Sequence, residues 1–236
     1  MAAVTLLEAR GLTRHFGGLK AVNGVDFALD EGEIHALIGP NGAGKTTFVS
    51  LLSGRIPAQS GTIRLRGRDI TRLPAHARVR AGIAYTFQIT QIYAALTVFD
   101  NVALAVQGRG GHPLAAQAMA ALDRVGLADH AGQIAGTLSY GHQRVLEIAM
   151  GLALAPLLLI LDEPTQGLAE GEIATFKDIV RSVVPQTTVL LIEHNMDVVM
   201  GLADRITVLN FGEVLATGTP AEIRANPAVQ AAYLGG

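Results

Sequence analysis

Cysteine is absent from the 236-residue sequence. Its absence excludes a disulfide framework, a thiol nucleophile and a zinc site built on cysteine ligands. An excess of one charge is also lacking: 18 Lys and Arg residues stand against 20 Asp and Glu residues, which gives a formal net charge of -2. No overall basic field therefore favours nucleic acid, and we expect no nucleic-acid partner.

Long hydrophobic runs are missing as well. The longest apolar stretch, residues 148–161, is shorter than the roughly 20 residues that a membrane-spanning helix needs, and it contains Pro156. The N-terminal segment carries Glu8 and Arg10 and has no apolar core of the kind found in signal peptides. The chain is therefore expected neither to cross a membrane by itself nor to be exported.

What is present is a hydrophobic chain long enough for a substantial core. Hydrophobic residues make up 50% of the sequence and charged residues 16%. This composition suits a protein whose faces are covered by partners, and equally a large α/β core rich in Ala, Leu and Val. The length fits one domain, with room for an embedded subdomain.

Strands and helices alternate at the two ends of the sequence and helices dominate its middle. The predicted strands are 4–8, 22–29, 33–38, 62–65, 83–87, 157–161, 188–192 and 206–209. The predicted helices are 45–53, 97–106, 113–125, 141–155, 170–184 and 196–202. We expect a mostly parallel sheet with helices on its faces. Residues 1–236 would form one domain, with a core from about 1–95 and 156–236 and a helical subdomain at about 96–155.

The strongest functional signal is a glycine-rich loop between a predicted strand and a predicted helix. Residues 39–46 fit the phosphate-loop pattern GxxxxGK[ST] in the context that this pattern requires. Backbone N–H groups of such a loop wrap a β/γ-phosphate pair at close range, where Cβ atoms at 42 and 44 would obstruct them. The expected nucleotide-binding residues are Gly39, Pro40, Asn41, Gly42, Ala43, Gly44, Lys45, Thr46 and Thr47.

Three side chains of this loop have expected roles in holding a nucleotide. Lys45 would place a positive charge on the β/γ-phosphate oxygens, and the Thr46 hydroxyl would ligate Mg²⁺. Thr47 is placed to bond the α-phosphate. The alternative, a glycine-rich turn that only joins a strand to a helix, is disfavoured because both the pattern and its context are present.

Two acids follow the apolar strand 157–161. Asp162 and Glu163 would lie at the carboxyl end of that strand, where open α/β sheets bind their ligands. Asp162 is expected to hold Mg²⁺ through its water shell, and Glu163 to orient the water that attacks the γ-phosphate. Taken alone, the pair would more simply be an acidic turn that caps the next helix; the phosphate loop favours the catalytic interpretation.

With these motifs in order, the chain resembles the ATPase subunits of ABC transporters along essentially its whole length. Residues 138–144 are similar to the signature segment of that family and lie between the phosphate loop and the acid pair. The resemblance implies that Ser139, Gly141 and His142 contact the γ-phosphate held by a second subunit. Tyr140 and His142 depart from the usual Leu-Ser-Gly-Gly-Gln.

The resemblance also gives roles to residues with ordinary structural alternatives. His194 matches the histidine that touches the γ-phosphate and helps position Glu163, although a lone histidine is more often structural. Gln88 matches the glutamine that contacts Mg²⁺ or the attacking water, and Phe16 matches the aromatic that stacks on adenine. Ala169 stands where many members have aspartate, in a loop that crosses the dimer interface.

The implied fold is an α/β P-loop NTPase of the ABC cassette type. It has a mostly parallel core sheet, an N-terminal antiparallel β region and an inserted helical subdomain. The implied activity is ATP hydrolysis, with ATP and Mg²⁺ as cofactors, coupled to transport across a membrane. The implied partners are a second ATPase subunit, identical or not, and membrane-spanning permease subunits.

Several segments are similar to the ATPases of branched-chain amino acid importers and their urea and amide relatives. These segments are 16–22, 82–88, 192–200 and 218–234. The similarity implies a periplasmic solute-binding protein and a peripheral position on the cytoplasmic face of the inner membrane. Residues 88–101 are expected to contact the membrane subunit, unless they only pack against helices.

Two other classes share the phosphate loop. A soluble ABC ATPase of DNA repair or translation would use the same nucleotide motifs, but such proteins generally carry two cassettes or long coiled-coil insertions. A P-loop kinase or GTPase would lack segment 138–144 and His194. The first class remains the alternative to a transport ATPase.

Overall fold

The computed structural model describes residues 4–86, 91–184 and 186–234. Its larger sheet has six strands in the order β10-β9-β3-β8-β7-β6. These strands are β3 Ile34–Ile38, β6 Ile83–Thr86, β7 Leu158–Asp162, β8 Thr188–Ile192, β9 Arg205–Asn210 and β10 Glu213–Gly218. All neighbours are parallel except β9 and β10. The predicted mostly parallel core sheet is confirmed.

A second, antiparallel sheet comes mainly from the N-terminal part of the chain. Its order is β2-β1-β4-β5, with β1 Thr5–Phe16, β2 Leu19–Asp30, β4 Ser60–Leu65 and β5 Arg68–Asp69. β1 is much longer than the predicted strand 4–8. Its pairing with β2 shifts register at several points and Gly11 has φ +57°, so the alternation that marks a strand is interrupted along the sequence.

Nine α-helices surround the sheets in the described part of the chain. They are α1 Lys45–Ser53, α2 Ala75–Arg80, α3 Val98–Gly108, α4 Leu114–Arg124, α5 Tyr140–Ala153, α6 Glu170–Val183, α7 Met196–Leu202, α8 Pro220–Ala225 and α9 Pro227–Leu234. The sequence prediction missed α2, α8, α9, β5 and β10. The Thr219 and Glu222 capping box at the start of α8 was a readable signal. None of the described helices is long and apolar enough to cross a membrane.

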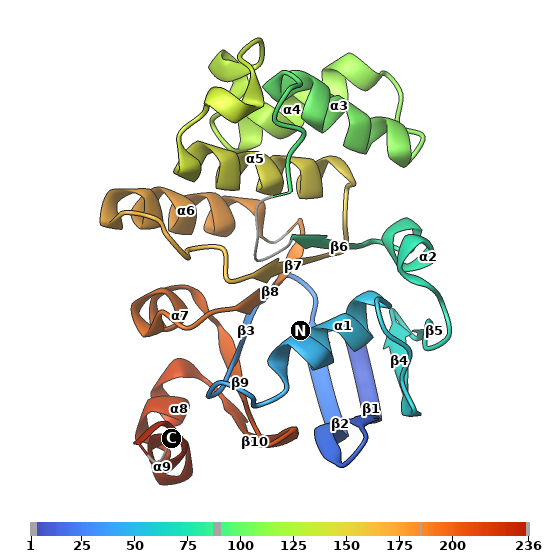
Figure 1. Ribbon diagram of the computed structural model, residues 1–236, viewed down its shortest axis with the longest axis vertical. Coiled ribbons are helices and arrows are strands. Elements are labelled where there is room, and N and C mark those ends of the chain that lie inside the picture. The colour runs from blue at the N-terminus through green and yellow to red at the C-terminus, as the bar shows by residue number, and fades with distance from the viewer. Residues whose placement is uncertain (1–3, 87–90, 185, 235–236) are drawn as a thin grey trace.

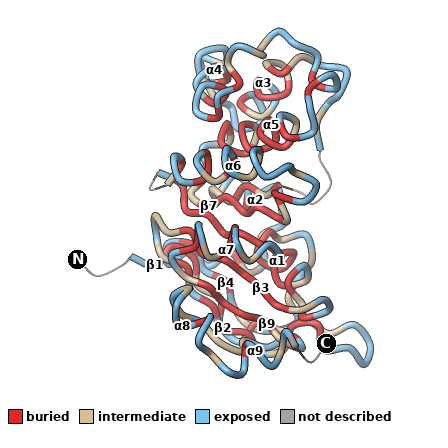
Figure 2. Tube along the Cα trace, turned by 90° about the vertical axis from the view of Figure 1, so that its left-hand side faces the viewer, coloured by how far each residue is buried: buried red, intermediate tan, exposed pale blue. Residues whose placement is uncertain are grey.

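Helices α3, α4 and α5 gather at one end of the molecule, and α6 lies between them and the sheet (Figure 1). One core cluster joins Val102, Leu122 and Leu146 of these helices to Leu159 and Leu191 of the sheet. The strands β3, β7 and β8 are buried along their whole length (Figure 2). Strands that are mostly apolar and buried throughout are typical of a parallel sheet covered on both faces.

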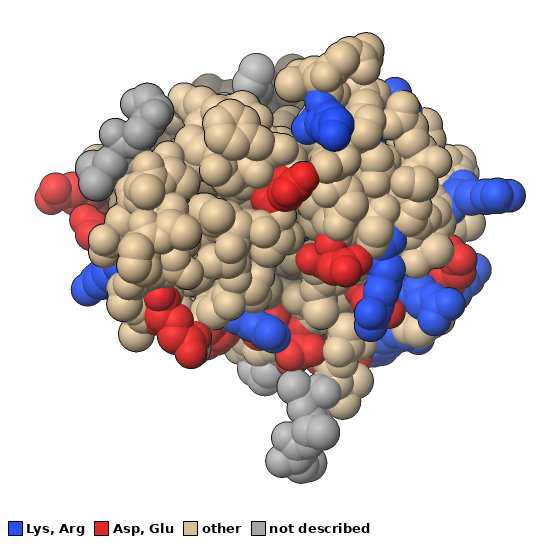
Figure 3. Space-filling model, turned by 90° about the horizontal axis from the view of Figure 1, so that it is seen from below, with Lys and Arg blue, Asp and Glu red and all other residues tan. Residues whose placement is uncertain are grey.

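The opposite face of the larger sheet packs against α1 and the antiparallel sheet. Phe48 and Leu52 of α1 lie in one cluster with Leu7 of β1 and Ile160 of β7. Packing in this core holds α1 in place relative to the carboxyl end of β3. The segment that connects the two elements carries the phosphate-loop motif. On the face seen from below, charged side chains of both signs are scattered among uncharged ones (Figure 3).

The C-terminal end of α1 is held by a buried arginine. Arg78 is 2% exposed, and its Nη1 donates to the carbonyls of Leu51 at 2.6 Å and Leu52 at 2.8 Å. Its other nitrogens donate to the carbonyls of Leu73 and Thr71. The guanidinium thereby supplies donors to two carbonyls in the last turn of α1, where intrahelical donors run out. Burial lowers the pKa of Arg78 to about 10.

We expect Arg78→Ala to lower the free energy of unfolding by about 3 kcal/mol or more, because two buried and two partly buried hydrogen bonds to backbone carbonyls are lost together with the packing of the side chain. Urea denaturation would measure the change. Arg80→Ala, at an exposed position of the same helix, should leave the midpoint almost unchanged. Equal stability of the two variants would contradict the capping role of Arg78.

Candidate functional site

The phosphate-loop motif connects β3 to α1, and its three glycines are required for two different reasons. A Cβ at Gly39 would lie 2.2 Å from the Leu209 carbonyl oxygen, and one at Gly44 would lie 2.1 Å from the Ala21 carbonyl oxygen. Gly42 has open space around it but a φ of +78°, which L-residues rarely adopt. A side chain at Gly44 would therefore collide with the protein's own backbone, and Gly42 is needed because its backbone has a positive φ.

Lys45 is folded back onto the start of the loop. Its Nζ donates to the carbonyl oxygens of Gly39 at 2.7 Å and Pro40 at 3.0 Å. Burial lowers the pKa of Lys45, while the negative charges of Glu163 and Asp162 act in the opposite direction. The ammonium group thus lies close enough to both acids to interact with them, on the loop where a nucleotide phosphate is expected.

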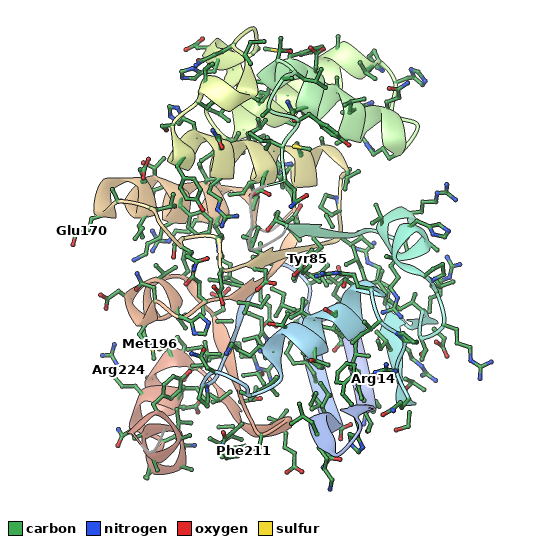
Figure 4. The ribbon with its side chains drawn as sticks, in the orientation of Figure 1. Arg14, Tyr85, Glu170, Met196, Phe211 and Arg224 are labelled. Atoms are coloured by element: carbon green, nitrogen blue, oxygen red, sulfur yellow. The ribbon has the colours of Figure 1, made fainter. Side chains whose placement is uncertain are left out.

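Asp162 ends β7 and is almost completely buried at 6% exposure. Tyr85 of β6 (Figure 4) donates its hydroxyl to Asp162 Oδ2. Burial raises the pKa of Asp162, and the Tyr85 hydrogen bond opposes this shift. Burial and the Asp162 charge raise the pKa of Tyr85. Sequence reasoning missed Tyr85, because only the pairing of β6 with β7 brings the two residues together.

Glu163 leaves the strand in an unusual conformation. Its φ is +48°, a left-handed region that non-glycine residues seldom occupy and that is enriched at functional sites. Its Oε1 lies 2.8 Å from Nε2 of His194. His194 precedes α7, which begins after Asn195, whose side chain accepts from the N–H groups of Asp197 and Val198. The structure therefore brings the predicted catalytic pair Glu163 and His194 into direct contact.

A cavity of about 250 Å³ lies over the phosphate loop. It is lined by Leu19, Ala21, Asn41, Gly42, Ala43, Gly44, Lys45, Thr46, Thr47, Glu163 and His194. Residues from the loop, from the end of β7 and from the start of α7 thus meet at one cavity. This convergence at the carboxyl ends of parallel strands is the expected position of a ligand site in an open α/β sheet.

The segment resembling the signature motif lies elsewhere. Ser139 is the N-cap of α5, and its Oγ accepts from the His142 N–H at 3.2 Å. A Cβ at Gly141 would lie 2.2 Å from Glu172 Oε1, and the His142 ring packs 4.9 Å from that of His130. None of the described residues that line the phosphate-loop cavity comes from 138–144. One chain alone does not join the two motifs.

Of the two remaining predicted site residues, Phe16 and Gln88, only Phe16 lies within the described residues. Phe16 ends β1, is 45% exposed, and has the Arg14 guanidinium 4.9 Å from its ring centroid. It pairs across the hairpin with Leu19, which lines the phosphate-loop cavity. The predicted roles of Gln88 lie outside the described residues.

A second cavity of about 300 Å³ lies between the edge of the sheet and the helices at the end of the molecule. It is lined by Tyr85, Thr86, Gln91, Tyr93, Leu104, Ala105, Glu147, Met150, Gly151 and Leu154. Glu147 is buried and paired with Arg144 at 3.0 Å, and its Oε1 accepts from the Gln91 N–H. The cavity includes part of the segment predicted to contact a membrane subunit.

Comparison with known proteins gives one family. Residues 22–166 match the family model described as ABC transporter, and residues 213–236 match the model described as branched-chain amino acid ATP-binding cassette transporter. The high-affinity branched-chain amino acid transport ATP-binding protein LivG of Salmonella typhimurium is 42% identical, over 98% of each chain. The corresponding protein BraF of Pseudomonas aeruginosa is 41% identical over 98% of each.

Solved structures agree with the sequence comparison. An ATP-binding cassette of an ABC transporter in its ADP conformation superposes with a TM-score of 0.90 at 27% identity, covering 98% of this chain and 99% of the other. A nucleotide-free cassette gives 0.90 and 27%, covering 98% and 100%. The fold is thus that of an ATP-binding cassette, and the chain belongs to the ABC transporter ATP-binding proteins of the branched-chain amino acid type.

Proposed function

We propose that this chain hydrolyses ATP and thereby powers the import of branched-chain amino acids or related small polar solutes. The observation that carries the catalytic part is the 2.8 Å contact between Glu163 Oε1 and His194 Nε2 beside the phosphate loop. The transport part is supported by the names of the relatives, which are branched-chain amino acid transport ATP-binding proteins.

The β- and γ-phosphates of ATP would lie in the loop 39–46, over the N-terminus of α1. Backbone N–H groups and the positive end of that helix favour an anion there. Lys45 would move its ammonium group from the Gly39 and Pro40 carbonyls to the phosphate oxygens. Glu163 would accept a proton from the attacking water, and His194 would hold the Glu163 carboxylate toward the γ-phosphate.

The residues at the site fit a magnesium ion that is held jointly with the nucleotide. Within the described ranges, no group of three or more His, Asp and Glu residues is arranged to hold a metal alone. Thr46 lines the cavity and Asp162 ends the neighbouring strand, and hydroxyl and carboxylate oxygens are ligands that Mg²⁺ prefers beside phosphates. Thr46, Asp162 and Gln88 would contact the ion or its waters, and the ion would neutralise charge on the β/γ oxygens.

A second ATPase subunit would complete the site. Ser139, Gly141 and His142 stand at the N-terminus of α5, where backbone N–H groups attract anions. They lie apart from the phosphate-loop cavity of their own chain, so they would contact the γ-phosphate bound by the partner. Phe16 would stack on the adenine at the rim of the same chain's cavity.

Permease subunits would dock at the cavity between the sheet edge and α3 and α5. Tyr93 and Leu104 are exposed there, at 57% and 42%, and present apolar surface to a partner. The chain would then lie on the cytoplasmic face of the inner membrane and act indirectly with a periplasmic solute-binding protein. We propose no nucleic-acid partner.

Phosphate release from ATP and Mg²⁺ by the purified chain, with and without its copurified membrane subunits, tests the proposal. His194→Ala should lower kcat by about 100-fold, because the carboxylate of Glu163 loses its orienting partner. His76→Ala, at an exposed position of α2, should hydrolyse ATP like the wild type. A His194→Ala variant with normal turnover, or a chain without ATPase activity in the complex, would contradict the proposed function.

A further inference from the structure

Glu193 is a buried carboxylate next to His194 in the sequence, and it does not line the phosphate-loop cavity. It follows β8 directly and is 3% exposed. No ion pair among the described residues includes it. An ionised carboxylate so deeply buried is costly unless donors replace the lost water.

The donors come from two different segments. Glu193 Oε1 accepts from the N–H of Thr165 at 2.9 Å and from the Thr165 hydroxyl at 2.5 Å. Its Oε2 accepts from the N–H of His194 at 2.9 Å and from the N–H of Asn195 at 3.2 Å. One carboxylate therefore bridges the turn after β7 to the segment that begins α7.

This bridge joins the same two segments as the contact between Glu163 and His194. Thr165 lies two residues after Glu163, and His194 comes directly after Glu193. A second link between the segments runs from the Glu163 N–H to the Ile192 carbonyl at 2.9 Å. Because these hydrogen bonds hold the backbone of both segments, the Glu163 and His194 side chains lose little further conformational freedom when they come into contact.

We propose that Glu193 is a positioning residue for ATP hydrolysis, which sets the distance between Glu163 and His194 by joining the Thr165 turn to the start of α7. The proposal rests on the proposed function of Glu163 and His194. In this proposal Glu193 does not contact the nucleotide, so the affinity for ATP should not depend on Glu193. Misplacement of catalytic groups by about 1 Å is enough to lower turnover strongly.

Glu193→Gln is the direct test, because the shape is kept while one acceptor becomes a donor. The amide nitrogen must then face either the Thr165 donors or the two N–H groups at the start of α7, and one segment is released. We expect kcat to fall by about tenfold to a hundredfold, with an unchanged KM for ATP. Amide hydrogen exchange should become faster in the Thr165 turn or at His194 and Asn195.

Three further variants separate positioning from a general loss of structure. Glu33→Gln removes another largely buried acid, bonded to His35 and to the Asp30 N–H before β3, and should leave kcat unchanged. Glu193→Asp restores the charge and should recover part of the lost turnover. Thr165→Val removes one donor, and in the Glu193→Gln background it should add little, because both changes break the same bridge.

Two results would overturn the positioning role. One is a Glu193→Gln variant with wild-type kcat and wild-type amide exchange. The other is a Glu193→Gln variant whose ATP affinity and melting temperature both fall far enough to account for its whole loss of activity. Glu163→Gln in the same assay separates the two proposals: if Glu163→Gln is slow and Glu193→Gln is not, only the role of Glu193 fails. If Glu163→Gln hydrolyses ATP normally, the proposed function itself fails.

Discussion

Replacing Glu163 by glutamine is expected to lower the rate of ATP hydrolysis by about 100-fold or more while ATP still binds. The amide keeps the size of the side chain but cannot take a proton from the attacking water. The phosphate loop and Lys45 are untouched, so ATP remains in its cavity. Because hydrolysis would normally reopen the paired subunits, the variant should accumulate as a dimer in ATP and Mg²⁺.

Size-exclusion chromatography with ATP and Mg²⁺ measures the amount of dimer, and a phosphate-release assay measures the rate of hydrolysis. Glu31→Gln provides a matched control, since Glu31 lies in the turn before β3 and pairs on the surface with Arg66 at 2.6 Å. This control should turn over ATP like the wild type and show no additional dimer. A Glu163→Gln chain that neither slows nor dimerises would remove the assigned role of Glu163.

Replacing Lys45 by alanine is expected to abolish tight ATP binding. The ammonium group would contribute charge-assisted hydrogen bonds to phosphate worth about 2 to 3 kcal/mol, which corresponds to a rise of roughly 30- to 150-fold in Kd. In the structure Nζ bonds to the Gly39 and Pro40 carbonyls, so the substitution also frees the start of the loop. Transport should be lost together with binding.

Titration calorimetry with ATP and Mg²⁺ measures the change in affinity. Lys177→Ala is the matched control, because Lys177 lies on α6 and donates to the Asp197 carbonyl at 3.1 Å, away from the loop. Its affinity for ATP should equal that of the wild type. Unchanged affinity in Lys45→Ala would contradict the assignment of the phosphate loop, even if transport were lost.

The pattern of short-range signals explains which elements could be predicted. The strands 33–38, 157–161 and 188–192 are mostly apolar and are followed by a glycine or an acid, and the structure has β3, β7 and β8 within a residue of these bounds. β10 follows β9 by a two-residue turn, with Phe211 at φ +46° and Gly212 at φ +80°, and its residues are mostly half-buried. An edge strand of this kind carries little periodicity.

Some residues of the candidate site could also be predicted from the sequence, and others could not. The phosphate loop and the acids 162 and 163 could be named from residue type and order, because each motif is local, and His194 could be named from the resemblance to ABC transporter ATPases. Tyr85 and Thr165 could not, because their partners Asp162 and Glu193 lie 77 and 28 positions away. Ser139 and Lys45 could both be named, yet no local pattern states that they lie in different parts of one chain.

By itself the sequence determined the class of this protein: a glycine loop before a helix and two acids after a buried strand are local patterns that reflect phosphate chemistry, and the family resemblance that their order supports gave His194 its role. Only the tertiary structure decided which side chains share the site and how they are held. The contact of Glu163 with His194, the hydroxyl of Tyr85 on Asp162 and the bridge through Glu193 all depend on the order of strands in the sheet. The physical reason is that hydrogen bonds between distant segments form only where the packed core brings those segments together.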